Sequence, residues 1–264
     1  MIVLHEIEIS ALTSLVDYCY TGSIEINESN VQSLLPAASL LQVSLVREAC
    51  CSFLLQQLHP NNCLGIRTFA DAHSCDQLLR VSNKFALENF SQVSLTDEFL
   101  SLPLKQVEDL ISSQQLNVAN EEVVFEAVMR WIKHDEEREM HLGQLLKHVK
   151  LPLTRRSFLL HVSEEPLIQN DEQGKDLLIE AMKYLLSPES RSTMNDNVRT
   201  QTRRPEGQTK YIFAIGGGSL FAIHNECEVY NPQTDRWSPI QPTIQRRSRA
   251  GVTSLDKFVY AIGE

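Results

Sequence analysis

The spacing of apolar residues changes once along the chain, and this change constrains the fold more than any single motif. As far as Leu186, apolar side chains recur at intervals of three and four residues, the period of amphipathic helices. From Tyr211 onward they alternate with polar residues between Gly, Asn and Pro, which is typical of short strands. The sequence therefore predicts a multidomain, mainly α-helical chain followed by a smaller β part.

Residues 187–210 separate the two parts, and their aliphatic side chains are Met194 and Val198. Such a segment cannot bury enough apolar surface to offset the entropy lost on ordering, so we expect a solvated linker. Arg199, Arg203 and Arg204 offer a basic tail as an alternative. Acidic and amide side chains interleaved in the segment favour the linker.

Residues 59–90 are predicted to form a helical hairpin that joins two helical units. Two apolar stripes follow one another at helical spacing: Ile66, Phe69, Ala70 and His73, then Leu78, Val81 and Phe85. Asn61 or Asn62 can cap the first helix, and Ser74 or Asp76 the second.

Helices are also expected on both sides of this hairpin. In the N-terminal part, residues 1–9 read as a short strand, and Pro36 is placed in the first turn of a helix. Between them one helix is predicted, with an inward stripe of Leu12, Leu15, Val16 and Cys19. Further on, Asn120 caps the strongest predicted helix, and Trp131 on that helix is expected to anchor the core.

The composition narrows the possible function classes. A net charge of -10 argues against a general nucleic-acid binder, which usually presents a basic face. No run of about 18 apolar residues is present, so no membrane span is expected. The first residues lack the basic start and long apolar core of a signal peptide. We therefore expect the six cysteines to be reduced thiols in the cytosol or nucleus.

The β part carries an internal repeat. The motif YIFAIGG at residues 211–217 recurs as FVYAIGE at residues 258–264, about 47 residues later, a period typical of propeller repeats. Turn-forming residues 231–235 precede Trp237, which we expect to lie in the core. A closed propeller needs about four or more such blades, and one blade with part of a second fits in this segment.

No pattern in the sequence predicts a catalytic centre, and we expect no enzyme. The motifs G-x-S-x-G and H-E-x-x-H, a Walker loop and a paired C-x-x-C are all missing. The run Gly216–Gly218 leads into β structure and not into a helix. It therefore favours a close approach of strands over phosphate binding.

Two groups of polar residues offer chemistry as an alternative to structural roles. His59, Cys63, His73 and Cys75 could form a zinc site, but helical spacing places Cys63 and His73 in an apolar stripe. The acidic residues 135–137 could supply catalytic carboxylates, but their position between two amphipathic helices favours an exposed turn. We therefore expect neither a metal ion nor a cofactor.

Three segments resemble, in order, the domains of Kelch-like proteins. Residues 15–22 and 34–42 resemble the C-terminal half of a BTB domain. Residues 60–64, 69–75, 116–131 and 151–153 look like a BACK domain. The glycines, the Tyr-Asn-Pro turn and the tryptophan of residues 216–237 resemble a Kelch blade.

This resemblance implies four segments. Half a BTB domain covers residues 1–58, and a full BACK helical domain covers residues 59–186. The linker covers residues 187–210, and the first Kelch repeat with the start of the second covers residues 211–264. A dimerisation helix and most propeller blades have no counterpart, so we expect a truncated form with impaired dimerisation and substrate binding.

The resemblance further implies a substrate adaptor of a cullin-3 ubiquitin ligase. In that family the BTB and BACK domains grip cullin-3, the BTB domain forms a homodimer, and the propeller holds the protein substrate. Tyr20 matches a cullin contact, with a packed tyrosine as the alternative. Asn62, Leu64 and Ile66 could line a groove for an extended cullin peptide, with plain core packing as the alternative.

Two other interpretations belong to different classes. Some Kelch proteins look like actin-binding scaffolds of the cytoskeleton, which makes actin an alternative partner. An oxidase or hydrolase with a Kelch-type propeller would need a full propeller with a metal site or a group of acidic residues at its centre, and this chain has neither. The expected partners are cullin-3 and a protein substrate, without nucleic acid or membrane. The expected compartment is the cytoplasm, with the nucleus or the cytoskeleton as alternatives.

Overall fold

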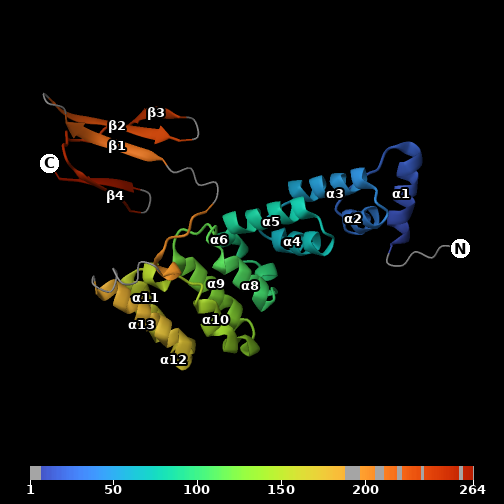
Figure 1. Ribbon diagram of the computed structural model, residues 1–264, viewed down its shortest axis with the longest axis horizontal. Coiled ribbons are helices and arrows are strands. Elements are labelled where there is room, and N and C mark those ends of the chain that lie inside the picture. Colours follow the sequence, from blue (N-terminus) through green and yellow to red (C-terminus); the bar gives the residue numbers. More distant parts are fainter. Residues whose placement is uncertain are drawn as a thin grey trace. The chain divides into compact units, whose positions relative to one another are not determined.

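The computed structural model describes residues 7–187, 197–205, 211–218, 222–232, 235–255 and 258–263. It divides into a helical unit that extends to Pro205 and a β unit that begins at Glu206. The predicted class, mainly α-helical with a smaller β part, is confirmed (Figure 1). Among the helices described, none combines the length and the apolar content needed to cross a membrane.

The helical unit begins with α1 (Ile9–Thr21), α2 (Val31–Leu40) and α3 (Ser44–Gln56). None of the three helices has a side-chain hydrogen bond at its N-cap. Burial of their apolar side chains holds them together. Their inner faces meet in the N-terminal cluster, a group of buried side chains that comprises Ala11, Leu15, Val31, Leu34, Leu35, Ala37, Ala38, Val46, Cys50, Leu54, Ala70, Cys75 and Leu78.

Several predictions for this part are corrected. Residues 1–6 of the expected strand lie outside the described residues, and Ile9 already belongs to α1. Pro36 does not open a new helix but lies inside α2. The buried neighbours of Pro36 offset the backbone hydrogen bond that a proline removes. Val16 and Cys19 are exposed instead of inward, because α1 packs through its opposite face.

The predicted hairpin consists of α4 (Cys63–Ala72) and α5 (Asp76–Glu88), as expected. Its turn is closed by the backbone, since the Cys75 N–H donates to the Ala70 carbonyl over 2.8 Å and Ser74 adopts a φ of 52°. Neither Ser74 nor Asp76 caps α5. Cys75 occupies the N-cap position without a side-chain hydrogen bond there.

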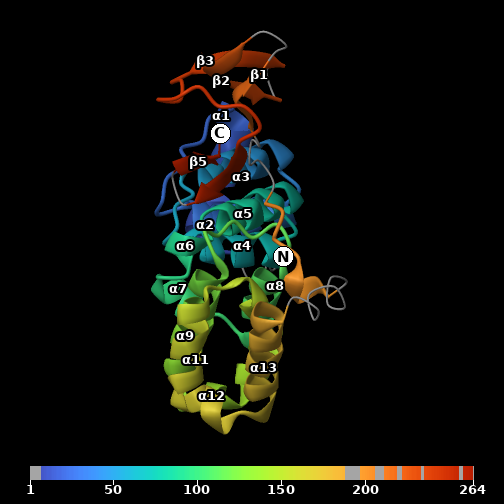
Figure 2. The same ribbon diagram turned by 90° about the vertical axis from the view of Figure 1, so that its left-hand side faces the viewer.

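The other helices surround the C-terminal cluster, a larger group of buried side chains from α4 to α13 that includes Leu64, Phe90, Phe99, Val128 and Trp131. These helices are α6 (Phe90–Val93), α7 (Asp97–Leu100), α8 (Leu104–Ser112), α9 (Glu121–Lys133), α10 (Leu142–Leu146), α11 (Arg156–Glu164), α12 (Pro166–Asn170) and α13 (Glu172–Leu186). Two 3-10 turns, η1 (Glu136–His141) and η2 (Leu151–Leu153), connect them. In both views α12 lies at the end away from α4 and α5 (Figure 2).

The strongest predicted helix, α9, is confirmed together with its cap and its anchor. The Asn120 side chain accepts a hydrogen bond from the Val123 N–H. Trp131 is buried, and its indole N–H donates to the Leu102 carbonyl over 3.0 Å. An indole buried with its donor satisfied stabilises a core without the cost of an unpaired polar group.

Residues 197–205 are partly held against the helical unit, although several of their side chains, among them Val198 and Arg204, are exposed as expected of a linker. They form the 3-10 turn η3 (Val198–Thr200) and then insert Arg203 into the helical unit. The side chains of Arg203 and Glu121 are 4% and 6% exposed, and Arg203 Nε lies 2.6 Å from Glu121 Oε1. Composition does not show this, because ion pairs and hydrogen bonds, and not apolar burial, hold the segment.

Arg203 uses every N–H of its guanidinium. Nε and Nη2 donate to the two carboxylate oxygens of Glu121. Nη1 donates to the carbonyls of Ile111 and Ser113, and Nη2 also donates to the carbonyl of His148. The first two carbonyls end α8, where backbone acceptors lack partners within the helix. Glu121 opens α9, where a negative charge complements the helix dipole.

The β unit contains two antiparallel sheets. Strands β1 (Ile212–Gly218), β2 (Ile223–Asn231) and β3 (Arg236–Ile240) pair in sequence order, and β4 (Gly251–Leu255) pairs with β5 (Phe258–Ile262). The close approach expected of the glycine run is confirmed at Gly216. There φ is 59°, and an added Cβ would meet the Arg247 carbonyl oxygen at 2.8 Å. Trp237, expected in the core, is 51% exposed and packs on Tyr230.

Removal of the Arg203 side chain should destabilise the helical unit. Arg203→Ala leaves the Glu121 carboxylate buried without its cation, so we expect the free energy of unfolding to fall by about 3–5 kcal/mol. Arg204→Ala is the matched control, because this side chain is exposed and its backbone N–H still donates to Gln114. The control should change stability by less than about 0.5 kcal/mol. Urea denaturation followed by far-ultraviolet circular dichroism measures both, and equal losses would contradict the assigned role.

The ion pair between Glu122 and Arg155 predicts a pH dependence. Hydrogen bonds from Arg155, 2.9 Å and 2.5 Å long, hold the pKa of Glu122 below its usual value of 4.5. A carboxylate whose pKa is lower when folded stabilises the fold above its unfolded pKa, and this contribution is lost as the pH falls. Glu122→Gln should therefore cost about 1 kcal/mol or less at neutral pH, since Arg155 is largely exposed. Thermal denaturation at several pH values should show the difference from the parent chain vanishing in acid; a constant difference would refute the assignment.

Candidate functional site

The exposed face of α1 is the first candidate site. Ile9, Val16 and Tyr20 are 81%, 47% and 88% exposed. Their spacing of seven and four residues places them on one side of the helix. Ala11 and Leu15, on the opposite side, are buried in the N-terminal cluster. An apolar row that faces solvent on a helix whose opposite side packs in a core is the kind of surface that partner proteins cover.

Tyr20 owes its position to the end of α1. Gly22 occupies the C-cap with a left-handed φ of 69°, and its N–H donates to the Tyr18 carbonyl. The helix therefore ends one residue after Tyr20, whose ring stays in the last turn and points away from the core. The Tyr20 side chain is exposed and does not pack in the core, and its contact with cullin stays a prediction.

The other three predicted contact residues do not share one open surface. Leu64 is 1% exposed and belongs to the C-terminal cluster, whereas the partly buried Ile66 packs against the N-terminal cluster. The Asn62 side chain is used within the chain: Oδ1 accepts from the His59 N–H, and Nδ2 donates to the Gln57 carbonyl. This arrangement matches the core-packing alternative for Leu64. A contact of these residues with cullin stays a prediction.

A shallow depression of about 670 Å³ lies where α4 meets α7 and α8. Leu64 and Gly65 form one wall, and Glu98 and Gln106 contribute to the other. The Glu98 carboxylate accepts the N–H groups of Leu64 and Gly65, both over 3.2 Å. It therefore occupies backbone donors at the start of α4 that would otherwise be free to bind a ligand.

The polar residues weighed for catalysis or metal binding lie apart or are used structurally. Cys63 is buried in the C-terminal cluster, whereas Cys75 belongs to the N-terminal cluster. Within the described ranges no group of three or more His, Cys, Asp or Glu side chains could hold a metal ion. Residues 135–137 are exposed, as expected, and the Asp135 carboxylate caps η1 by accepting the Glu137 N–H.

Lys150 has a lowered pKa, but it lines neither of the two candidate surfaces described above. It is 2% exposed, and its ammonium donates to Gln114 Oε1 and to the Gln201 carbonyl, each over 2.6 Å. Burial lowers the pKa of Lys150, and the nearby charge of Arg203 lowers it further, while Glu121 raises it. The group helps hold residues 197–205 in place and faces no cavity described here.

Sequence reasoning missed two parts of the exposed α1 face. Val16 was assigned to the inward stripe, and Ile9 to a strand. The signal was available, because Ile9, Val16 and Tyr20 form a second stripe at helical spacing beside the inward one. A helix with apolar residues on both sides does not reveal from its own sequence which side is covered.

Two family models match the chain in tandem. The BTB/POZ domain matches residues 1–58, and the domain described as BTB And C-terminal Kelch, or BACK, matches residues 63–164. Together they account for α1 to α11 of the helical unit.

Curated relatives match almost the full chain. Kelch-like protein 17 of Homo sapiens is 52% identical over 256 residues, which is 96% of this chain and 40% of that protein. Kelch-like protein 3 of Bos taurus is 48% identical over 260 residues, which is 98% of this chain and 44% of that protein. The chain thus spans 40–44% of the length of these relatives. With two domain matches in the expected order and about half of its residues shared with these proteins, the chain belongs to the Kelch-like family.

Proposed function

We propose that this protein is a non-enzymatic adaptor that binds cullin-3 of a ubiquitin ligase and brings a protein substrate to it. The observation that carries the proposal is the exposed apolar row of α1, with Tyr20 at its end. An adaptor needs no reacting groups, because it accelerates modification by raising the local concentration of two proteins. This lack of reacting groups agrees with the structural roles found for the buried charged residues of the helical unit.

Tyr20 has the properties of an interface anchor. A tyrosine supplies a large apolar ring and a hydroxyl at a low entropic cost, and such residues are frequent among those that dominate binding energy. Ile9 and Val16 extend the row from Tyr20 over about three turns of α1, which suits a helix of the partner or a hydrophobic strip on it. We assign cullin-3 as the occupant because the Kelch-like resemblance places its cullin contact at Tyr20.

The same proposal assigns substrate binding to the β unit and to blades that complete it in the parent protein. The described strands offer exposed aromatic residues, among them Phe213 and Trp237. Homodimerisation and the identity of the substrate depend on segments that have no counterpart among these residues. The actin-scaffold alternative has no feature of its own in the described structure that favours it.

Binding to the N-terminal region of cullin-3 tests the proposal. We expect the parent chain to bind, and Tyr20→Ala to weaken binding by about 5- to 30-fold, which corresponds to about 1–2 kcal/mol lost at an anchoring residue. Tyr211→Ala is the matched control, because Tyr211 is also exposed but lies in the β unit. It should leave the affinity unchanged. Calorimetric titration measures all three.

Folding and partner class are checked in the same experiment. Circular dichroism must show that Tyr20→Ala keeps the helical content of the parent chain. Co-sedimentation with actin filaments then separates the two classes. A chain that pellets with filaments and does not bind cullin-3 would favour the scaffold, and equal weakening by both tyrosine substitutions would remove Tyr20 from the proposed interface.

A further inference from the structure

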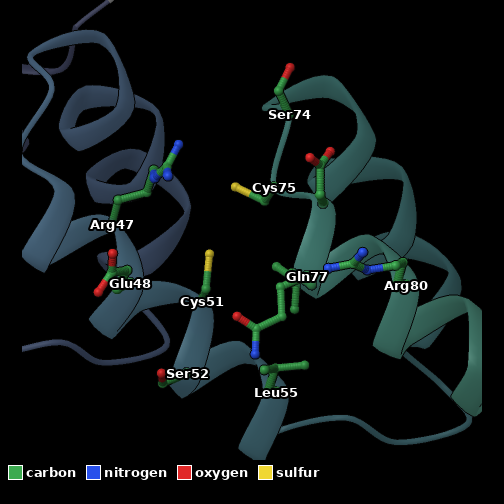
Figure 3. A pocket seen from close by; sticks show the side chains of 11 residues that line it. Arg47, Glu48, Cys51, Ser52, Leu55, Ser74, Cys75, Gln77 and Arg80 are labelled. Carbon is green, nitrogen blue, oxygen red and sulfur yellow. The ribbon is translucent and has the colours of Figure 1, made fainter.

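A pocket between α3 and the start of α5 brings two cysteines together. It has a volume of about 420 Å³, and its lining includes Arg47 and Cys51 from α3, and Cys75 and Arg80 from the second half of the hairpin. Figure 3 shows both thiols pointing into the space between the two helices. The cysteines are 24 residues apart in sequence, so only the packing of α5 on α3 makes them neighbours.

The two thiols differ in access. Cys75 is buried, and its Sγ donates to the His73 carbonyl over 3.6 Å. Cys51 is half-buried, and it reaches the pocket one helical turn after Arg47. Neither Arg47 nor Arg80 has an ion-pair partner among the residues that the structure describes. Glu48 and Asp76 line the same pocket, so charges of both signs surround the more exposed thiol.

We propose that Cys51 and Cys75 form a reversible disulfide that links α3 to the start of α5 when a small disulfide such as oxidised glutathione is present. Both cysteines are free thiols in this structure. The site is independent of the proposed adaptor function, because none of its residues belongs to the exposed row of α1.

The reaction is thiol–disulfide exchange in two steps. One cysteine thiolate attacks a sulfur of oxidised glutathione, which forms a mixed disulfide and releases one glutathione thiolate. The other cysteine thiolate attacks the protein sulfur of that mixed disulfide and releases the second glutathione. Two protein thiols are oxidised, one small disulfide is reduced, and the two protons pass from the cysteines to the two products.

The surroundings of the two cysteines slow the first step of the exchange and favour the second, in which the Cys51–Cys75 disulfide forms. Burial, the charge of Cys75 and a hydrogen bond with it raise the pKa of the Cys51 thiol to about 12. The attacking thiolate is therefore scarce at neutral pH. Once a mixed disulfide exists, the second thiol is held next to it, and the effective concentration favours the intramolecular step over attack by free thiols. We expect the rate of oxidation to rise about tenfold per pH unit below the pKa of the attacking thiol.

The link would tie α3 to the hairpin within the N-terminal cluster. Cys51 packs against the N-terminal cluster from α3, and Cys75 opens α5, whose far end packs in the C-terminal cluster. A covalent bond at this point would hold α3 against the hairpin. The oxidised chain should therefore resist urea to a higher concentration than the reduced chain.

The test incubates the folded full chain in glutathione buffers of increasing oxidised fraction, blocks free thiols with N-ethylmaleimide in acid, and maps linked peptides by mass spectrometry. We expect a Cys51–Cys75 linked peptide and a loss of two reactive thiols. The link should be missing from Cys51→Ser and Cys75→Ser and should persist in Cys19→Ser, whose cysteine is exposed on α1. Cys50→Ser is the second control, because Cys50 is adjacent in sequence and buried.

Several results would overturn the proposal. Mixed glutathione disulfides without an internal link would show that the pair does not close. A link through Cys50, or one that forms only in urea, would show that the pocket geometry does not direct the reaction. Circular dichroism of each variant confirms that it is folded before oxidation, so that loss of the link in Cys51→Ser reports on the thiol itself.

Discussion

The buried ion pair between Arg203 and Glu121 fixes residues 197–205 to helices that the C-terminal cluster already packs together. One guanidinium contacts the start of α9, the end of α8 and the segment after α10. A lysine could not replace it, because only the planar arginine head supplies five donors in a fixed arrangement. Its partners lie at helix ends: the buried carboxylate of Glu121 at the N-terminus of α9, and carbonyls at or just after the C-termini of α8 and α10.

A buried pair of this kind specifies a position more than it adds stability. Desolvation of two charges offsets much of their attraction, so the net gain is small while both partners are present. Loss of one partner is costly, because the other charge remains buried. Residues 197–205 are therefore held at one place on the unit, and Lys150 reinforces this by donating to the Gln201 carbonyl. The β unit begins a few residues later, at Glu206.

The helical hairpin has a comparable role at the other end of the unit. Its helix α4 places Leu64 in the C-terminal cluster and Ala70 in the N-terminal cluster, and α5 does the same with Ala86 and Leu78. Because both helices belong to both cores, the two clusters cannot move apart without exposing apolar surface. The proposed adaptor function would benefit from such a joint, since the distance between two binding surfaces has to be maintained. The proposed link between Cys51 and Cys75 would act on the same joint.

Local patterns in the sequence were sufficient for the helical character, the two helices of the hairpin, the cap at Asn120 and the β pairing after Tyr211. These features depend on residues within a few positions of one another, through helical periodicity, strand alternation and turn chemistry. Pro36 was misjudged because buried neighbours offset its missing hydrogen bond. The contact of Arg203 with the helical unit was not predicted, because its partner Glu121 is about 80 residues away in the sequence. The exposure of Tyr20, the burial of Leu64 and the meeting of Cys51 with Cys75 likewise follow from packing between distant segments, which no local pattern encodes.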